Sequence, residues 1–270
     1  MDKVSNFVEL KKSSKIWAIG SIHSNLKSFN SIKKFILNSF EENNKLIFLG
    51  NIIGLGNYSK ETLSSVIDLR FKLMSKFKLK PDSIVFLRGA QEEMFSKLLQ
   101  LQLAPNPTEI VEWMFDHGVN NTTKSYGFSD DEVKNIASSG TINISKWTSN
   151  LNKVIQKNPG HPQYFLSLKH AAYSHTKKIL FVNRGVDITR PLSAQNDCFW
   201  WGYQNFSTIY QPYKTFSRIV RGYESEHLNR SEVLKNEVVC TLFKQPLSNE
   251  NVLCGIFGEN GEILDLFENN

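Results

Sequence analysis

Short apolar runs alternate with amphipathic stretches over the first hundred residues of the chain. Residues 15–20, 45–50 and 83–87 are apolar runs that predict buried strands, and residues 26–40, 61–77 and 92–101 place apolar side chains at helical spacing. Strand, helix, strand, helix at this rhythm predicts parallel βαβ units. The first part of the chain is therefore expected to be an α/β layer with a parallel sheet.

The rest of the chain changes character twice. Residues 105–160 are more polar, with Asn, Ser, Thr and Gly clusters, and indicate a helical insertion. Beyond them, residues 178–182, 217–220, 237–242, 252–257 and 262–267 predict strands, the last three antiparallel, with a hairpin turn at 258–261. We expect an α/β fold in which two mixed sheets pack as a sandwich flanked by helices. One domain would span residues 15–270, after an N-terminal extension of residues 1–14.

Composition narrows the class of protein. The net charge of +6 favours anionic partners, nucleic acid included, but only weakly because the basic residues are scattered. Cys198, Cys240 and Cys254 are too few and too dispersed for a disulfide framework or a CxxC metal site. No apolar run approaches the roughly 18 residues of a membrane span, and residues 1–15 lack a signal-like run. These features predict a cytoplasmic protein with no membrane partner.

Three segments that follow the first three predicted strands carry the strongest functional signal, because ligands bind where parallel strands deliver their loops. They are Gly20–Asn25, Gly50–Gly56 and Arg88–Glu92. In order and spacing they resemble the GDxHG, GDxxDRG and GNHE motifs of the calcineurin-like metallophosphoesterases. They are most similar to those of bacterial serine/threonine phosphoprotein phosphatases and symmetrical diadenosine tetraphosphatases. Further similarities bring the coverage to about residues 15–268: Trp113–Gly127, Phe181–Val186, Pro191–Gly202, Ile219–Tyr223 and Leu253–Leu264.

The resemblance implies a metallophosphatase-type site with two divalent metals such as Mn, Fe or Zn, which activate water for attack on phosphate. The six positions that correspond to metal ligands hold Ser21, His23, Asn51, Ala90, Asn183 and Tyr223, so one ligand is retained. The positions of the supporting Asp, the phosphate-binding Arg and the general-acid His hold Gly54, Leu55 and Gln91. Ser, Ala and Tyr are poor ligands for hard cations, so we expect no metal cofactor and no catalytic residue.

The residues that shape the loops match the family pattern, in contrast to the ligands. Glu92 and the glycines of the strand ends are present: Gly20, Gly50, Gly56, Gly89, Gly185, Gly222 and Gly255. Because His23 is the one retained ligand and a metal site needs about three, we expect it to be a packed or hydrogen-bonded histidine.

Three arginines motivate a binding hypothesis. Arg88, Arg184 and Arg221 lie beside the altered positions. If they point into the site, their charge would partly replace that of the metals and hold a phosphate or carboxylate without hydrolysis. The alternative is that they face solvent or pair with carboxylates such as Glu92 or Asp187.

Together these features predict a catalytically inactive metallophosphatase-fold protein, a pseudophosphatase. It would act as a binding, scaffold or regulatory subunit with a protein partner, which could be phosphorylated. The alternative is a metal-dependent phosphoesterase, either a serine/threonine protein phosphatase or a dinucleoside tetraphosphate hydrolase, with residual or rearranged activity. A nucleic-acid-associated subunit is a third reading and rests on net charge alone.

Overall fold

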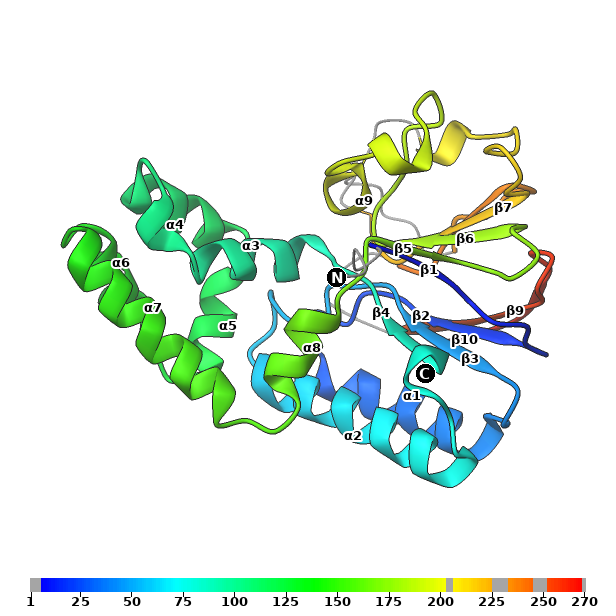
Figure 1. Cartoon of the computed structure of the whole chain (residues 1–270), viewed down its shortest axis with the longest axis horizontal. Helices are drawn as coiled ribbons and strands as arrows, with labels where there is room; N and C mark the ends of the chain where they lie inside the picture. Colours follow the sequence, from blue (N-terminus) through cyan, green and yellow to red (C-terminus); the bar gives the residue numbers. More distant parts are fainter. Residues whose placement is uncertain (1–5, 203–205, 225–232, 245–251, 269–270) are drawn as a thin grey trace, which may run out of the picture.

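The computed structural model describes residues 6–202, 206–224, 233–244 and 252–268, in which two five-stranded sheets lie face to face (Figure 1). The order of the first sheet is β10 (Ile263–Glu268), β9 (Leu253–Phe257), β2 (Ile16–Ile19), β3 (Lys45–Phe48) and β4 (Ile84–Phe86). In this sheet, β2 pairs with β3 and β3 with β4 in parallel, while β9 runs antiparallel to both β2 and β10.

The second sheet is also mixed, as the sequence predicts. Its order is β1 (Phe7–Glu9), β5 (Ala171–Tyr173), β6 (Ile179–Val182), β7 (Arg218–Arg221) and β8 (Val239–Thr241). Only β5 and β6 pair antiparallel. The prediction that β8 is antiparallel is wrong, because β8 runs parallel to β7. The stretch from residue 222 to 238 is long enough for the crossover that a parallel pair requires.

The central strands are buried on both faces, which explains their continuous apolar runs. Successive side chains of a strand point to opposite faces. Accordingly, Ile16 and Ala18 of β2 lie in the core between the sheets with Phe181. Trp17 and Ile19 lie in the core between the sheet and the helices.

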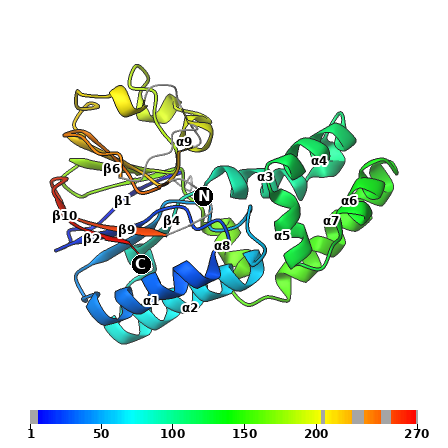
Figure 2. The same cartoon turned by 180° about the vertical axis from the view of Figure 1, so that it is seen from behind.

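Helices α1 (Leu26–Ser39) and α2 (Ser59–Phe77) lie side by side on the outer face of the first sheet (Figures 1 and 2). The side chain of Asn25 begins α1 by accepting a 3.0 Å hydrogen bond from the amide of Ser28. On the outer face of the second sheet, the short helix α9 (Cys198–Trp201) contributes Phe199 and Trp200 to a third apolar cluster.

Between β4 and β5 the chain is helical, and α4 to α7 extend to one side of the sheets (Figure 1). Trp147 and Leu151 of α7 belong to the same apolar cluster as Trp17 of β2, so these helices are continuous with the core. The helices are α3 (Ala90–Leu98), α4 (Pro107–Asp116), α5 (Val119–Ser125), α6 (Asp130–Ala137), α7 (Thr141–Gln156) and α8 (His161–Ser167). No helix in the described ranges has the length and apolar character needed to cross a membrane.

Candidate functional site

The loops that follow the strands of both sheets converge on a cavity of about 360 Å³. Seven of the residues singled out in the sequence line it: His23, Asn51, Leu55, Ala90, Gln91, Arg184 and Tyr223. The remaining lining residues are Met94, Trp113, Asp116, His117 and Trp201. Ser21, Gly54, Asn183, Arg88 and Arg221 are outside this lining. The motif positions are thus brought together in space, as their order and spacing predict.

Asn51 occupies the position that corresponds to the bridging metal ligand, and its side chain is held by the protein itself. Its Oδ1 accepts a 3.0 Å hydrogen bond from the amide of Gln91, and its Nδ2 donates to Ser21 Oγ over 3.3 Å. Its backbone lies in the left-handed region, with φ of 53°. The neutral amide therefore replaces a charged ligand and bonds to its neighbours in the loops.

Two further amides behave similarly. Asn183 Nδ2 donates to the carbonyl of Leu49 over 2.6 Å, and Gln91 Nε2 donates to the carbonyl of His117 over 2.8 Å. Their carbonyl oxygens are buried and have no hydrogen-bond partner among the described residues. The side chain of Gln91 also accounts for the glycine at position 54, because a Cβ there would lie 1.9 Å from Gln91 Oε1. The side chain at position 91 thus occupies the space that an Asp at position 54 would need.

His23 is buried among aromatic side chains. Its side chain is 3% exposed, and its ring centre lies 4.9 Å from that of Tyr223 and 6.2 Å from that of Phe243. Neither ring nitrogen has a partner among the residues that the structure describes. Burial lowers the pKa of His23 to about 3, so the imidazole is neutral at pH 7.

Glu92 holds the loops of the site in place. Its fully buried carboxylate accepts hydrogen bonds from the amides of Asn51 and Ile52, both at 2.8 Å, and of Gly89 at 3.0 Å. The hydroxyl of Tyr164 donates a further bond of 3.0 Å. Burial raises the pKa of Glu92, whereas the amide hydrogen bonds act in the opposite direction. Glu92 is therefore a structural residue that joins two of the motif loops.

The three arginines do not converge on the cavity. Arg88 Nη1 pairs with Glu93 at 2.6 Å, a partner that the sequence did not indicate. Arg221 Nη2 pairs with Glu224 at 2.8 Å, and both side chains are buried. The prediction of a three-arginine anion site is therefore revised to Arg184, whose guanidinium lies 5.8 Å from the ring centre of Tyr223.

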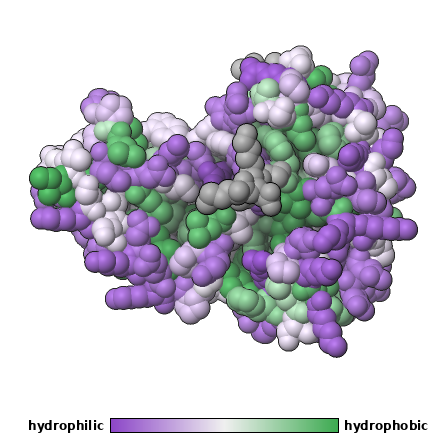
Figure 3. Space-filling model, in the orientation of Figure 1, coloured by the Kyte–Doolittle hydropathy of each residue, from purple (hydrophilic) through white to green (hydrophobic). Residues whose placement is uncertain are grey.

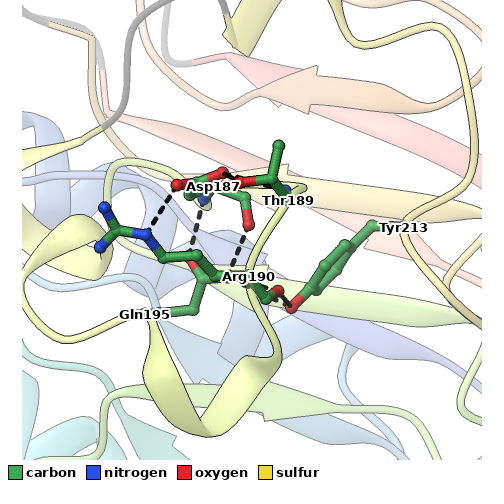
Figure 4. A network of polar contacts seen from close by, with 5 residues as sticks. All are labelled: Asp187, Thr189, Arg190, Gln195 and Tyr213. Atoms are coloured by element: carbon green, nitrogen blue, oxygen red, sulfur yellow. Dashed lines mark hydrogen bonds and ion pairs between the residues drawn. The ribbon is translucent and has the colours of Figure 1, made fainter.

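The segment after Arg184 is braced by a network of polar contacts (Figure 4). The carboxylate of Asp187 accepts from Thr189 Oγ1 at 2.6 Å and from Arg190 Nε at 2.9 Å, and the Thr189 bond lowers the pKa of Asp187. Gln195 bonds both the amide and the carbonyl of Asp187 at 2.7 Å, and Tyr213 donates to the carbonyl of Arg190 at 2.6 Å. Asp187 is thus engaged within its own loop and with Arg190.

Trp113 and Trp201, here called the aromatic wall, line the same cavity as the motif residues, and sequence reasoning missed their contact. The ring centres of Trp113 and His117 are 4.4 Å apart, and those of Trp113 and Trp201 are 5.8 Å apart in an edge-on arrangement. Trp113 and Trp201 come from α4 and α9, which are far apart in the sequence. The only signal for Trp113 was its place in the family-like stretch, and nothing in the pattern predicted its contact with Trp201.

These residues do not fit a pair of divalent cations. Of the six corresponding positions, only His23 offers a strong ligand, and it is packed between aromatic rings. The Oδ1 of Asn51 already accepts a hydrogen bond from the amide of Gln91, and Asn183, whose Oδ1 has no partner among the described residues, could offer only a neutral oxygen. Within the described ranges, no three His, Cys, Asp or Glu side chains gather as they would around a metal. Asp116 is the one carboxylate in the lining described above.

Comparisons with known proteins support the fold alone. No protein-family model and no curated protein matches the sequence. A provisionally assigned diadenosine tetraphosphatase has a similar structure, with a TM-score of 0.56 and 13% identity over 98% of this chain and 99% of the other. A cold-active protein tyrosine phosphatase has a TM-score of 0.50 and 14% identity over 98% of this chain and 80% of its own.

A metallophosphoesterase from Sphaerobacter thermophilus is more distant, with a TM-score of 0.47 and 14% identity over 96% of this chain and 88% of the other. Identities this low establish shared architecture and nothing about chemistry. The two mixed sheets, the motif loops at their edge and the similarity to the tetraphosphatase structure agree with one another. The chain therefore has the fold of the calcineurin-like metallophosphoesterases.

Proposed function

We propose that this protein is a catalytically inactive member of the metallophosphatase fold, a pseudophosphatase that acts by binding. The observation that carries the proposal is the state of Asn51. At the position that corresponds to the bridging ligand stands a neutral amide, whose oxygen is bonded to the amide of Gln91 and whose nitrogen donates to Ser21.

The electrostatic argument follows from that arrangement. Two dications a few ångströms apart repel each other strongly and need anionic ligands to offset the repulsion. The side chains of Ser21, Asn51, Ala90 and Asn183 carry no charge, and His23 is neutral. Burial raises the pKa of Tyr223, so its phenol keeps its proton at pH 7. No residue at these positions can supply the charge. Water in this cavity would therefore keep its ordinary reactivity, and no nucleophile for phosphate would form.

A binding role is supported by the backbone of the same loops. Among the described residues, eight non-glycine residues have positive φ, and four of them lie in these loops: His23, Ser24, Asn51 and Leu55. Each such residue costs roughly 1–2 kcal/mol unless its surroundings hold it. Glu92 provides that support through its bonds to the loop amides. The loops thus keep a strained backbone although the metal-ligand positions hold other residues.

The partner that we propose is a protein that presents an anionic group, such as a phosphorylated side chain. Arg184 would bind that group, and the aromatic wall of Trp113 and Trp201 would cover the adjacent segment. We also propose a cytoplasmic location, because all three cysteines are buried free thiols, as expected in a reducing compartment.

The test combines hydrolysis with binding. Purified protein is assayed with p-nitrophenyl phosphate in the presence of added manganese, its metal content is measured, and a library of phosphopeptides is screened against it. We expect no turnover above the heat-denatured protein, no stoichiometric metal, and binding of some phosphopeptides that is weakened in Arg184→Met.

Two results would count against the proposal. Turnover that depends on manganese and is abolished by Asn51→Ala would mean that the site is an active phosphoesterase. Equal phosphopeptide binding by the wild type and by Arg184→Met would mean that Arg184 does not bind the anionic group. The control variant is Lys134→Met, which removes one positive charge from the exposed surface of α6.

A further inference from the structure

A second cavity, of about 330 Å³, lies between α2 and α8 and shares no lining residue with the site described above. The two helices contact each other, and both lie in front in Figure 1. Figure 3 shows apolar surface in the middle of the same face, between more hydrophilic margins. The cavity is lined by Ile67, Arg70, Phe71, Phe86, Gly160, Gln163 and Tyr164.

Arg70 is the one charged residue in this lining, and in the part of the chain that the structure describes it forms no ion pair with a carboxylate. Its Nε is buried without a hydrogen-bond partner among the described residues, and its guanidinium lies 5.5 Å from the ring centre of Phe86. The nearby acid on α2, Asp68, is paired with Lys33 at 2.7 Å and with Lys72 at 2.8 Å. Burial lowers the pKa of Arg70, and no neighbouring charge opposes that effect. Arg70 is half-buried, and its guanidinium lines the cavity, where it could pair with an anionic ligand.

Apart from the amide of Gln163, the remaining lining is largely apolar. Ile67 and Phe86 are buried, and the hydroxyl of Tyr164 is turned to Glu92, so the ring of Tyr164 serves as wall. Phe71 stands at the rim and is 60% exposed. Gly160 has φ of 83°, and a Cβ there would approach Ile67 Cγ2 to 2.8 Å. The cavity thus combines one fixed cation with a hydrocarbon and aromatic lining.

We propose that this cavity binds a small organic acid, with a single carboxylate on Arg70 and an apolar body against Phe71 and Phe86. The planar guanidinium matches a carboxylate in geometry. A single arginine, with no second cation in the lining, balances a monoanion and leaves a phosphate dianion only half compensated. The volume is at the lower end of the range for small-ligand sites, which suits an acid of medium chain length. The proposal is independent of the inactive-enzyme proposal.

The test is calorimetric titration of the full chain with decanoate. Arg70→Met removes the cation but keeps a similar apolar volume, and Lys72→Met is the matched control, since Lys72 lies on the same helix outside the lining. We expect saturable binding of decanoate that weakens about tenfold or more in Arg70→Met, as for the loss of a charged hydrogen bond. Lys72→Met should bind as the wild type does. The uncharged 1-decanol should bind at least about tenfold more weakly than decanoate.

Thermal unfolding provides a second measurement that does not depend on heat of binding. Decanoate should raise the Tm of the wild type and of Lys72→Met, but not that of Arg70→Met. Without ligand, Arg70→Met should unfold at a Tm no lower than the wild type, because it removes an uncompensated charge. That result also shows that the variant is folded.

Several outcomes would overturn the proposal. Absence of saturable decanoate binding by the wild type excludes the site. Equal binding by Arg70→Met and the wild type means that the arginine does not anchor the acid. Equal binding of decanoate and 1-decanol indicates adsorption to exposed apolar surface. If inorganic phosphate alone protects the wild type and not Arg70→Met, the anion is a phosphate and the carboxylate assignment is wrong.

Discussion

Replacing Glu92 with alanine tests whether one buried carboxylate holds the motif loops of the candidate site in place. The perturbation removes both oxygens that accept hydrogen bonds from the amides of Asn51, Ile52 and Gly89 and from the hydroxyl of Tyr164. The site is fully buried, so these four donors would lose their partners far from bulk water.

The expected loss of stability follows from those bonds. A buried donor without a partner costs about 1–3 kcal/mol, and water that enters the space left by the side chain would satisfy some of the four donors and reduce the total loss. We therefore expect a decrease of about 4 kcal/mol in the free energy of unfolding, a size that is exceptional for a single substitution. Glu92→Gln keeps one acceptor oxygen and should cost about half as much.

The assay is urea unfolding followed by circular dichroism, with the midpoint and the slope compared between variants. The control is Glu112→Ala, which removes an exposed carboxylate from α4 and should change stability by less than about 0.5 kcal/mol. A decrease below about 1 kcal/mol for Glu92→Ala, at unchanged slope, would show that the loop amides do not depend on this carboxylate.

Three further predictions concern packing, pH and a buried ion pair. Gly89→Ala would place a Cβ 2.2 Å from Asn51 Oδ1, so we expect a loss of roughly 3 kcal/mol in urea unfolding; a near-neutral effect would contradict this contact. His161 has its pKa lowered to about 4 by burial, so the wild type should lose stability as pH falls from about 6.5 towards 4. Between pH 7 and pH 5, the free energy of unfolding of His161→Gln should decrease by about 1 kcal/mol less than that of the wild type. Equal decreases in the two proteins, measured by thermal unfolding at each pH, would refute this. Arg221→Met leaves Glu224 buried and unpaired, at a cost of about 3 kcal/mol, and Glu224→Gln should restore most of it; strict additivity in the double-mutant cycle would argue against the pair.

The elements of the first half of the fold could be predicted closely from the sequence. The expected strands at 15–20, 45–50 and 83–87 contain β2, β3 and β4, and the expected helix at 26–40 contains α1. These elements are long or strongly apolar, so the periodic pattern is clear. By contrast, β1 lies in the segment read as an N-terminal extension, and β5 was missed. Each has three residues, as β4 does, but β1 includes Glu9 and β5 begins with two alanines, so neither forms a strongly apolar run.

The candidate site shows the same division. The positions of the motif residues could be predicted because they follow strand ends, and seven of them do line one cavity. Their interactions could not be predicted. The partners of Arg88 and Arg221 are Glu93 and Glu224, and neither pairing is encoded by a motif. The parallel direction of β8 likewise depends on the path of the segment that connects it to β7. The apolar residues of the strand do not indicate that path.

The sequence by itself determined which chemical groups stand at the motif positions, because the presence of Ser21, Asn51, Ala90 and Asn183 is a property of the chain and not of its folding. Only the tertiary structure decided how the replacements are used. Asn51 bonds to Gln91 across 40 residues of sequence, and Asn183 to Leu49 across 134. Arg70 is an ordinary residue of an amphipathic helix in the sequence, but in the fold it lines a cavity with residues of α8, and its Nε is buried without a hydrogen-bond partner among the described residues. Hydrogen bonds and burial depend on which distant segments the fold brings within a few ångströms, and a linear pattern carries no measure of that distance.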